Sequence, residues 1–323
     1  MSPEFNGNPI SVLAGELASF GGMSVNPDEP LASRTTLKIG GPAELFAKVL
    51  TEPALQHLLN QARALSVPWR ILGLGSNVLV PDEGLEGLTV VLAGDFLELS
   101  ISDSEVTAGA GLPLGRVARS AVESGLTGLE ALAGFPSTVG GAVVMNAGCY
   151  GVEIKDILEC ATVLLPEGGR EVVRVDDIAP GYRSTNLQGR GAIVTQATFR
   201  LRTGDAGEAQ QRLIDLNRRR RASMPSGKPN AGSVFKNPEG GFAGRLIEAC
   251  GLKGIQSGGA EISPAHANVI VNNGAARAAD VLELMLIMRC AVADKFQVAL
   301  EPELILVGAL GDRWHQMLAD RRH

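Results

Sequence analysis

Aromatic residues are scarce in this sequence and make up only 4% of its 323 residues. A chain with so few aromatic side chains offers few of the platforms on which the bases of single-stranded nucleic acid stack. The formal net charge is -6, which argues against a general binder of phosphate backbones. Nucleic acid is therefore not expected as a partner.

Cysteine and histidine are also few, with four residues of each. The cysteines occur singly, and the spacing of zinc ligands is absent, so no metal site is expected. Dispersed thiols are typical of a reducing cytoplasm. The sequence lacks both the ~20-residue apolar run of a membrane span and the pattern of a signal peptide. We therefore expect a cytoplasmic protein with no membrane partner.

Glycine, in contrast, is abundant, with 40 residues. A glycine excess without a collagen repeat indicates tight turns or backbone that lies close to a ligand. The chain is also long for a single hydrophobic core, which predicts two or three domains.

The hydrophobic periodicity predicts a mixed α and β chain. Residues 1–33 are expected to form a loosely ordered lead-in with one short helix, and regular structure is expected to begin near Thr36. Strands are expected at 43–50, 69–72, 89–92, 105–109, 161–165, 192–201 and 303–307. Helices are expected at 52–65, 114–123, 208–222, 242–250 and 279–296.

The segment Gly73-Leu74-Gly75-Ser76-Asn77 directly follows an expected strand. Backbone N–H groups next to glycines are unobstructed and can point at a diphosphate. The third glycine and the long helix of a dinucleotide-binding fingerprint are missing. An ordinary strand-to-loop turn therefore remains an equal alternative.

A second glycine-rich run extends from Gly134 to Gly151, with five glycines among mostly apolar neighbours. It is too apolar for a linker and too rich in glycine for a strand. Backbone lying against a flat apolar ligand fits both properties. We favour this interpretation over a buried loop that packs on the core.

Polar side chains with catalytic potential occur in three later segments. The adjacent Tyr182 and Arg183 can donate to an oxyanion and hold a carboxylate, although most such surface pairs do nothing catalytic. Ser233 follows a glycine and can donate a proton where its surroundings stabilise the alkoxide. Glu303 lies in an apolar stretch, where a carboxylate is costly to bury unless it is paired, so it is a candidate functional acid or a strand-start carboxylate that faces water.

Two basic features could hold a phosphate group: Lys236 and the run Arg218–Arg221. Most charge runs of this kind form a solvated helix face, and that interpretation of the arginines stays open.

Taken in order, these segments resemble one family, the UDP-N-acetylenolpyruvoylglucosamine reductases (MurB). The likeness covers roughly residues 30 to 308, from the motif at 36–43 to Glu301-Pro302-Glu303. The sequence Gly-Ser-x-Phe-Lys-Asn-Pro at 232–238 is its most distinctive part. The segment 202–230 is short and contains no tyrosine, which is similar to the shorter, type II form of the family.

The resemblance implies an α+β fold with a two-part FAD-binding region of the vanillyl-alcohol-oxidase (PCMH) type and an α+β substrate-binding domain. The boundaries expected on this basis are 1–33 for the lead-in, 34–93 and 94–203 for the two FAD-binding parts, 204–308 for the substrate domain and 309–323 for a C-terminal tail.

The resemblance also implies an activity: FAD-dependent, NADPH-consuming reduction of a UDP-sugar enolpyruvyl ether in peptidoglycan precursor synthesis, and hence a part in cell wall biogenesis, cell shape and cell division. FAD would be non-covalent, NADPH a co-substrate, and the protein a monomer. Arg183, Ser233 and Glu303 would be catalytic. Tyr182, Asn237, Lys236 and Arg221 would bind the substrate. The cofactor would contact Gly73, Leu74, Gly75, Ser76, Asn77, Pro136, Ser137, Thr138, Gly140, Gly141, Asn146, Ala147, Gly148, Tyr150 and Ile193.

This sequence departs from the family pattern at two positions. Ser137 stands where the family often has glycine, and a positive φ would be less comfortable for serine. Ile305 stands where an arginine is common, so we expect a changed flavin potential or a substitute cation. Two rival functions stay open at this point: an oxidase with the same FAD fold, and a catalytically idle FAD-holding protein.

Overall fold

The computed structural model describes residues 8–320, and these divide into two compact units. The first unit comprises the residues up to Pro27 together with Glu44–Leu74 and Gly87–Arg219. The second comprises Asp28–Ala43, Gly75–Glu86 and the residues from Arg220 on. Each unit therefore draws on segments that are far apart in the sequence.

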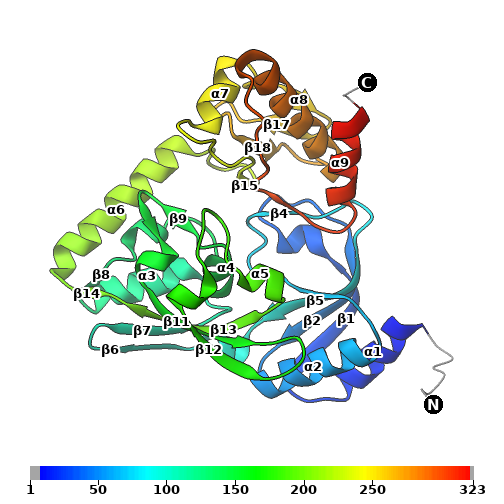
Figure 1. Cartoon of the computed structure of the whole chain (residues 1–323), viewed down its shortest axis with the longest axis vertical. Coiled ribbons are helices and arrows are strands. Elements are labelled where there is room, and N and C mark those ends of the chain that lie inside the picture. The colour runs from blue at the N-terminus through cyan, green and yellow to red at the C-terminus, as the bar shows by residue number, and fades with distance from the viewer. Residues whose placement is uncertain (1–7, 321–323) are drawn as a thin grey trace. The chain divides into compact units, whose positions relative to one another are not determined.

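The first sheet of the first unit has the strand order β1-β2-β5-β3. Two helices supply the buried leucines that pack with this sheet in the core of the unit (Figure 1). Helix α2 forms because the Thr51 side chain accepts a hydrogen bond from the Ala54 N–H, and because its apolar residues recur on one buried face. The elements are α1 (Pro9–Ala18), β1 (Met23–Pro30), β2 (Pro42–Val49), α2 (Glu52–Ala64), β3 (Trp69–Ile71) and β5 (Leu85–Leu92).

The second sheet of this unit is antiparallel, with the order β12-β11-β13-β7-β6. Figure 1 shows β11, β13 and β7 side by side, and α4 packs on β13. The elements are β6 (Leu99–Ser102), β7 (Glu105–Gly109), α3 (Leu114–Glu123), β8 (Leu126–Thr127), α4 (Val139–Val144), β9 (Gly148–Cys149), β10 (Val152–Glu153), β11 (Leu158–Leu164), β12 (Arg170–Arg174), α5 (Leu187–Arg190), β13 (Ile193–Arg200) and β14 (Arg202–Thr203).

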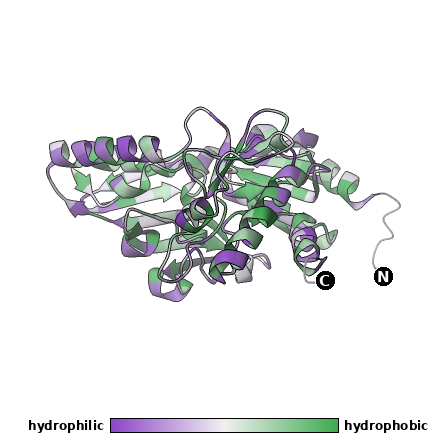
Figure 2. Ribbon diagram, turned by 90° about the horizontal axis from the view of Figure 1, so that it is seen from above, coloured by the Kyte–Doolittle hydropathy of each residue, from purple (hydrophilic) through white to green (hydrophobic). Residues whose placement is uncertain are grey.

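Helix α6 (Ala206–Ser223) is mostly hydrophilic, as Figure 2 shows. Only Ala209 and Leu213 are buried along it. Its Arg212 forms an ion pair with the buried carboxylate of Glu130 at 3.2 Å. Because a buried carboxylate is costly without a partner, this pair fixes the helix on the first unit.

The second unit is built around the antiparallel sheet β15-β18-β17-β16, and helix α8 packs on β16 and β17. A separate parallel pair joins β19 to β4. The elements are β4 (Val78–Leu79), β15 (Asn230–Ser233), α7 (Ala243–Ala249), β16 (Gln256–Ser257), β17 (Ala260–Ile262), β18 (Val269–Asn272), α8 (Ala278–Phe296), β19 (Ile305–Leu306) and α9 (Leu310–Asp320).

Each strand and each helix expected from periodicity is present. The elements at 105–109 and 114–123 have the expected bounds, and the others have shifted ends. The short helix expected in the lead-in is present as α1, but the described part of the lead-in also contains a strand, and the tail contains a helix. Strand β1 joins the first sheet, and Leu13 and Leu17 of α1 are fully buried, so regular structure begins well before Thr36. Helix α9 buries Leu310 and Trp314 in the core of the second unit. Residues 1–7 and 321–323 of these two segments lie outside the described residues.

The division of the chain also differs from the expected one. It falls at Arg219 and Arg220 within α6, not near Gly204, because α6 continues the first unit through its contacts with Glu130. Segments 28–43 and 75–86 belong to the second unit, where they contribute Leu37, Ile39 and Leu79 to its core.

Trp314 provides a test of the role of α9. Its ring lies 6.5 Å from that of Phe235, which is fully buried. We expect Trp314→Ala to lower the free energy of unfolding by about 3–5 kcal/mol, because it leaves a large cavity in the core. Urea denaturation measures the effect. The exposed neighbour His315→Ala should change stability by no more than about 0.5 kcal/mol, and equal effects of the two changes would contradict the assignment of α9 to this core.

Candidate active site

Ser233 is the last residue of β15, in the second unit, and pairs with Val269 of β18. The register of this pair shifts between Asn230 and Ser233. Gly232 has φ +74°, a conformation that glycine adopts readily, and its N–H donates to the Asn230 side chain at 3.1 Å. The irregularity sets the direction in which the half-buried Ser233 leaves the strand.

Glu303 is brought to the Ser233 segment by the backbone. Its N–H donates to the carbonyl of Val234 at 2.8 Å, and the N–H of Leu304 donates to the same oxygen at 3.2 Å. The N–H of Lys236 donates to the carbonyl of Glu301 at 2.9 Å. The two segments that carry the expected proton donor and the expected carboxylate are thus fixed against each other.

Asn77 also bonds to the segment that carries Glu303. Its side-chain amide donates to the carbonyl of Glu303 at 3.0 Å, and its own carbonyl accepts from the N–H of Ile305 at 3.0 Å. Val78 and Leu79 then continue as the parallel partner of β19. The end of the first glycine-rich segment therefore lies beside the last motif of the chain, and Ile305 occupies the position next to it.

Two expected substrate-binding residues have partners within the second unit. Lys236 forms an ion pair with Glu301 at 3.6 Å. The side chain of Asn237 accepts a hydrogen bond from the Ala243 N–H at 3.1 Å, at the start of α7. Arg221 is exposed in the last turn of α6.

The two glycine-rich segments meet in the first unit. A Cβ on Gly73 would lie 2.8 Å from the hydroxyl oxygen of Thr138, which is too close for a real contact. The same hydroxyl accepts the Gly141 N–H at 3.2 Å and begins α4. The Gly134–Gly151 run therefore contains a short helix, capped by Thr138, which the sequence did not predict.

Glycine is also needed at Gly140 and Gly75. A Cβ on Gly140 would lie 3.0 Å from that of Ala110, to whose carbonyl its N–H donates at 2.8 Å. Gly75, in the second unit, has φ +61° and packs against the carbonyl of Arg34. The backbone strain expected at Ser137 is absent, because Ser137 does not have a positive φ.

Asn146 organises the region around Arg183. Its buried amide donates to Glu153 at 3.1 Å and to the carbonyl of Gly181 at 2.9 Å, and its oxygen accepts from the Lys155 N–H at 3.0 Å. These internal bonds engage both ends of the amide. Asn146 therefore shapes the loops, with φ +39° at its own backbone.

Arg183 reaches the second glycine-rich run. Its guanidinium donates to the carbonyl of Gly148 at 3.1 Å and lies 4.9 Å from the ring centre of Tyr182. Its φ is +58°, an uncommon value for arginine. The structure thus brings Arg183 together with Gly148, while Ser233 and Glu303 belong to the other unit.

In the arginine run of α6, Arg219 contacts an expected cofactor residue. The guanidinium of Arg219 lies 5.3 Å from the ring centre of Tyr150, which is partly exposed. Arg218 is paired with Asp215 at 3.1 Å. Among the first two arginines of the run, Arg219 is therefore the one directed at the glycine-rich segment.

The remaining expected cofactor residues have varied environments. Ile193 is buried in the second sheet, where it pairs with Leu164, and so belongs to the core. Ala147 donates to the Ala142 carbonyl at 2.8 Å and closes the end of α4. Leu74 and Pro136 are exposed, and Ser76 is half-buried.

Asn268, near the Ser233 segment, was not singled out from the sequence, and His266 was expected to be a helix or loop residue rather than a base. Asn268 is 2% exposed and hydrogen bonds to Phe235 through its side chain. The Nδ1 of His266 accepts the Asn268 N–H at 3.2 Å. A single asparagine in the otherwise apolar run 267–271 is the signal that marks a buried polar contact.

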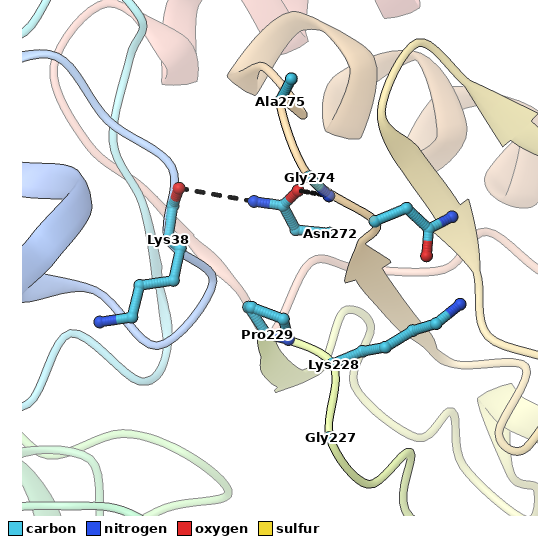
Figure 3. Close-up of a pocket in the computed structure, with 8 residues that line it drawn as sticks. Lys38, Gly227, Lys228, Pro229, Asn272, Gly274 and Ala275 are labelled. Atoms are coloured by element: carbon cyan, nitrogen blue, oxygen red, sulfur yellow. Dashed lines mark hydrogen bonds between the residues drawn. The ribbon is translucent and has the colours of Figure 1, made fainter.

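A cavity of about 480 Å³ in the second unit is lined by Lys38, Lys228 and Asn272 among others (Figure 3). Figure 3 shows the two ammonium groups directed away from each other. Lys38 donates to the carbonyl of Ser33 at 3.2 Å, and Lys228 pairs with Glu261 at 3.0 Å. Because both cations already have partners, we do not assign this cavity a part in substrate binding.

Comparisons with known proteins first define the class. A family model described as "FAD binding domain" matches residues 43–175, which include Gly73, Thr138 and Gly148. A second, "UDP-N-acetylenolpyruvoylglucosamine reductase, C-terminal domain", matches residues 224–307, which include Ser233 and Glu303. The fold is thus α+β, with an FAD-binding domain followed by a second domain, and the protein is a flavoprotein.

Full-length relatives then define the family. The chain is 44% identical over 280 residues to UDP-N-acetylenolpyruvoylglucosamine reductase 2 of Symbiobacterium thermophilum, covering 87% of this chain and 91% of that one. It is 41% identical over 284 residues to the reductase of Halalkalibacterium halodurans, covering 88% and 94%. The crystal structure of the Thermus caldophilus reductase (MurB) matches with a TM-score of 0.76 at 39% identity, covering 88% and 99%. The chain belongs to the UDP-N-acetylenolpyruvoylglucosamine reductase family.

Across residues 8–320, none of the helices combines the length and the apolar character needed to cross a membrane.

The contact between Gly73 and Thr138 predicts an effect on flavin binding. We expect Gly73→Ala to displace the Thr138 hydroxyl, loosen the start of α4 and lower the amount of FAD that purifies with the protein. The ratio of flavin to protein absorbance measures this loss. Gly189→Ala is the matched control, because a Cβ at Gly189 meets nothing within 4 Å. A fully loaded Gly73→Ala protein would contradict the expected role of this contact.

His266 predicts a pH dependence of stability. Burial, followed by the charge of Lys253, holds the pKa of His266 below its ordinary value of 6.5, and its Nδ1 acts as an acceptor. The unfolded chain therefore takes up the proton first as the pH falls, and stability present above 6.5 is lost as the pH drops through the folded-state pKa.

Thermal or urea unfolding between neutral and mildly acidic pH measures this loss. His266→Gln should flatten the dependence, because its side chain does not titrate, whereas His315→Gln at an exposed position should leave it as it is. An unaltered pH dependence in the His266→Gln protein would disprove the assignment.

Proposed function

We propose that this protein catalyses the FAD-dependent, NADPH-consuming reduction of UDP-N-acetylglucosamine enolpyruvate to UDP-N-acetylmuramate in peptidoglycan precursor synthesis, with Ser233, Glu303 and Arg183 at the reacting groups. The observation that carries the assignment of residues is the pair of hydrogen bonds from Glu303 and Leu304 to Val234. They hold a proton donor and a carboxylate at a fixed separation, in a chain of the reductase family.

When bound, FAD supplies the hydride that adds to the methylene carbon of the enolpyruvyl group. The glycine-rich segments fit such a cofactor. Gly73 lies so close to the Thr138 hydroxyl that a Cβ at position 73 would collide with it, so only glycine allows the two segments to approach this closely. The backbone of Gly73, Gly75 and Asn77 would hold the diphosphate, and the 136–150 run would line the ring systems.

The protein's task in the second half of the reaction is to stabilise the negative charge that develops on the enolpyruvyl carbon and its carboxylate. Arg183 presents a planar guanidinium that binds a carboxylate through two hydrogen bonds. Glu303 acts at the same end of the substrate. Preorganised groups of this kind supply much of a typical rate enhancement, because they need no rearrangement as the charge forms.

Ser233 completes the reaction by donating its hydroxyl proton to the carbon that carries the developing charge. A new C–H bond forms, the O–H bond of serine breaks, and the alkoxide regains a proton from solvent. The half-buried position of Ser233 at the end of β15 gives its hydroxyl access to a substrate while its backbone stays fixed.

The UDP-sugar would be positioned by Tyr182, Asn237, Lys236 and Arg221. Arg219 joins them as a candidate for the phosphates, because its guanidinium already lies over Tyr150. The proposal keeps the roles expected for the parts of the chain, FAD binding for 34–93 and 94–203 and substrate binding for 204–308, but with the boundary between the last two moved to Arg219 and Arg220. It also includes a monomeric state, a cytoplasmic location and a contribution to cell shape and division. The effect of Ile305 on the flavin potential stays a prediction, supported by its bond to Asn77.

The proposed role of Ser233 can be tested with the two halves of the reaction measured separately. We expect Ser233→Ala to retain FAD and to be reduced by NADPH at the wild-type rate. Its reoxidation by the enolpyruvyl substrate should slow by about 10²–10⁴-fold, because a general acid is missing. Stopped-flow absorbance of the flavin follows both steps.

The exposed Ser226→Ala is the matched control and should resemble the wild type in both steps. Wild-type reoxidation of the Ser233→Ala protein would show that another group delivers the proton. A protein that never reduces the enolpyruvyl sugar would instead support an idle FAD-holding role.

A further inference from the structure

Asn268, which directly precedes β18, is a buried polar residue that the reaction described above does not use. We propose that Asn268 is a positioning residue that holds Ser233 in register for proton transfer. This inference rests on the proposed role of Ser233. It concerns a residue that touches neither substrate nor cofactor and acts through the backbone of β15.

Three hydrogen bonds connect Asn268 to the two residues that follow Ser233. The carbonyl of Asn268 accepts the Val234 N–H at 2.8 Å. Its side-chain oxygen accepts the Phe235 N–H at 3.0 Å, and its side-chain nitrogen donates to the Phe235 carbonyl at 2.8 Å. The planar amide thus offers Phe235 the donor and the acceptor that a neighbouring strand would offer.

The side chain is needed because regular pairing ends at this point. Ser233 opposite Val269 is the last paired position of β15 with β18, and the register has already shifted between Asn230 and Ser233. A strand end next to such an irregularity is free to slide unless further bonds pin it. Beyond Ser233, one backbone bond remains, from Val234 to the Asn268 carbonyl, and the Asn268 side chain supplies the two bonds that hold Phe235.

The opposite edge of the segment is fixed independently. The carbonyl of Val234 accepts from Glu303 and Leu304, and Phe235 forms an isolated bridge with Pro302. Loss of the Asn268 amide would therefore leave Glu303 in place and release only the side of the segment that faces β18. We therefore expect that substitution of Asn268 displaces the Ser233 hydroxyl and leaves the rest of the site unchanged.

Asn268 is itself fixed by hydrogen bonds that involve His266 and Ser263. Its N–H donates to Nδ1 of His266 at 3.2 Å, and the hydroxyl of Ser263 accepts the N–H groups of Ala265 and His266 at 3.2 and 3.4 Å. Asn268 and Ser263 are 2% and 1% exposed. A buried and hydrogen-bonded network of this kind gives one defined conformation, as a positioning residue requires.

Asn272, the last residue of β18, offers a matched control. It is also buried, and its amide donates to the carbonyl of Leu37 at 3.1 Å and accepts the Gly274 N–H at 2.8 Å. Removing either amide should destabilise the fold to a similar degree, because each leaves buried backbone groups without partners. Only Asn268 is connected to the residues after Ser233.

The experiment compares Asn268→Asp, Asn268→Ala and Asn272→Ala as FAD-loaded, full-length proteins. Asn268→Asp keeps the volume of the side chain and replaces the donor to Phe235, so it stays informative if Asn268→Ala does not fold. The rates of flavin reduction by NADPH and of reoxidation by UDP-N-acetylglucosamine enolpyruvate are measured separately, together with the unfolding temperature.

We expect the Asn268 variants to keep the wild-type rate of reduction by NADPH and to lose about 10²-fold in reoxidation, the scale of a small displacement of a reacting group. Asn272→Ala should lose stability and keep both rates. Wild-type reoxidation in the Asn268 variants, or equal slowing of both steps, would overturn the proposal.

Ser233→Ala, measured in parallel, separates this inference from the proposed function. Slow reoxidation in Ser233→Ala with wild-type reoxidation in the Asn268 variants would overturn the positioning role alone. Wild-type reoxidation in Ser233→Ala would overturn the role of the serine, and the positioning role with it.

Discussion

The arrangement of the candidate active site depends on the hydrogen bonds that the carbonyl oxygen of Val234 accepts. This oxygen accepts two N–H groups from the segment that carries Glu303, while the adjacent N–H of Val234 is held by Asn268. Ser233 is the residue immediately before this point. Ser233 and Glu303, the proposed proton donor and carboxylate, lie 70 residues apart in sequence, and these backbone bonds fix the segments that carry them relative to each other.

The same principle appears in the first unit, where small residues permit the close approach of distant segments. Gly73 fits against the hydroxyl of Thr138, and Arg183 reaches the carbonyl of Gly148. The backbone geometry depends on Gly73 in the first place and on Gly148 in the second, and neither glycine takes part in a proposed catalytic step. The proposed site therefore depends on two kinds of residue: those proposed to meet the substrate, and those that fix the loops that carry them.

Much of this structure could be predicted from the sequence, but the supporting residues could not. The helices at 52–64 and 278–296 were predicted because their apolar residues recur with helical spacing or extend over several turns. Helix α4 was not, because glycines have low helix propensity and only the Thr138 cap shows where it begins. The contacts of Asn268 could not be predicted from a sequence motif, because its side-chain partners are backbone groups 33 residues away.

The most direct test of the account is the visible absorbance of the flavin in the purified protein under anaerobic conditions. NADPH should bleach the flavin band, and UDP-N-acetylglucosamine enolpyruvate added afterwards should restore it in full, because the substrate takes up the stored electrons. A protein without a flavin band, or a bleached flavin that the enolpyruvyl sugar does not reoxidise, would contradict the account.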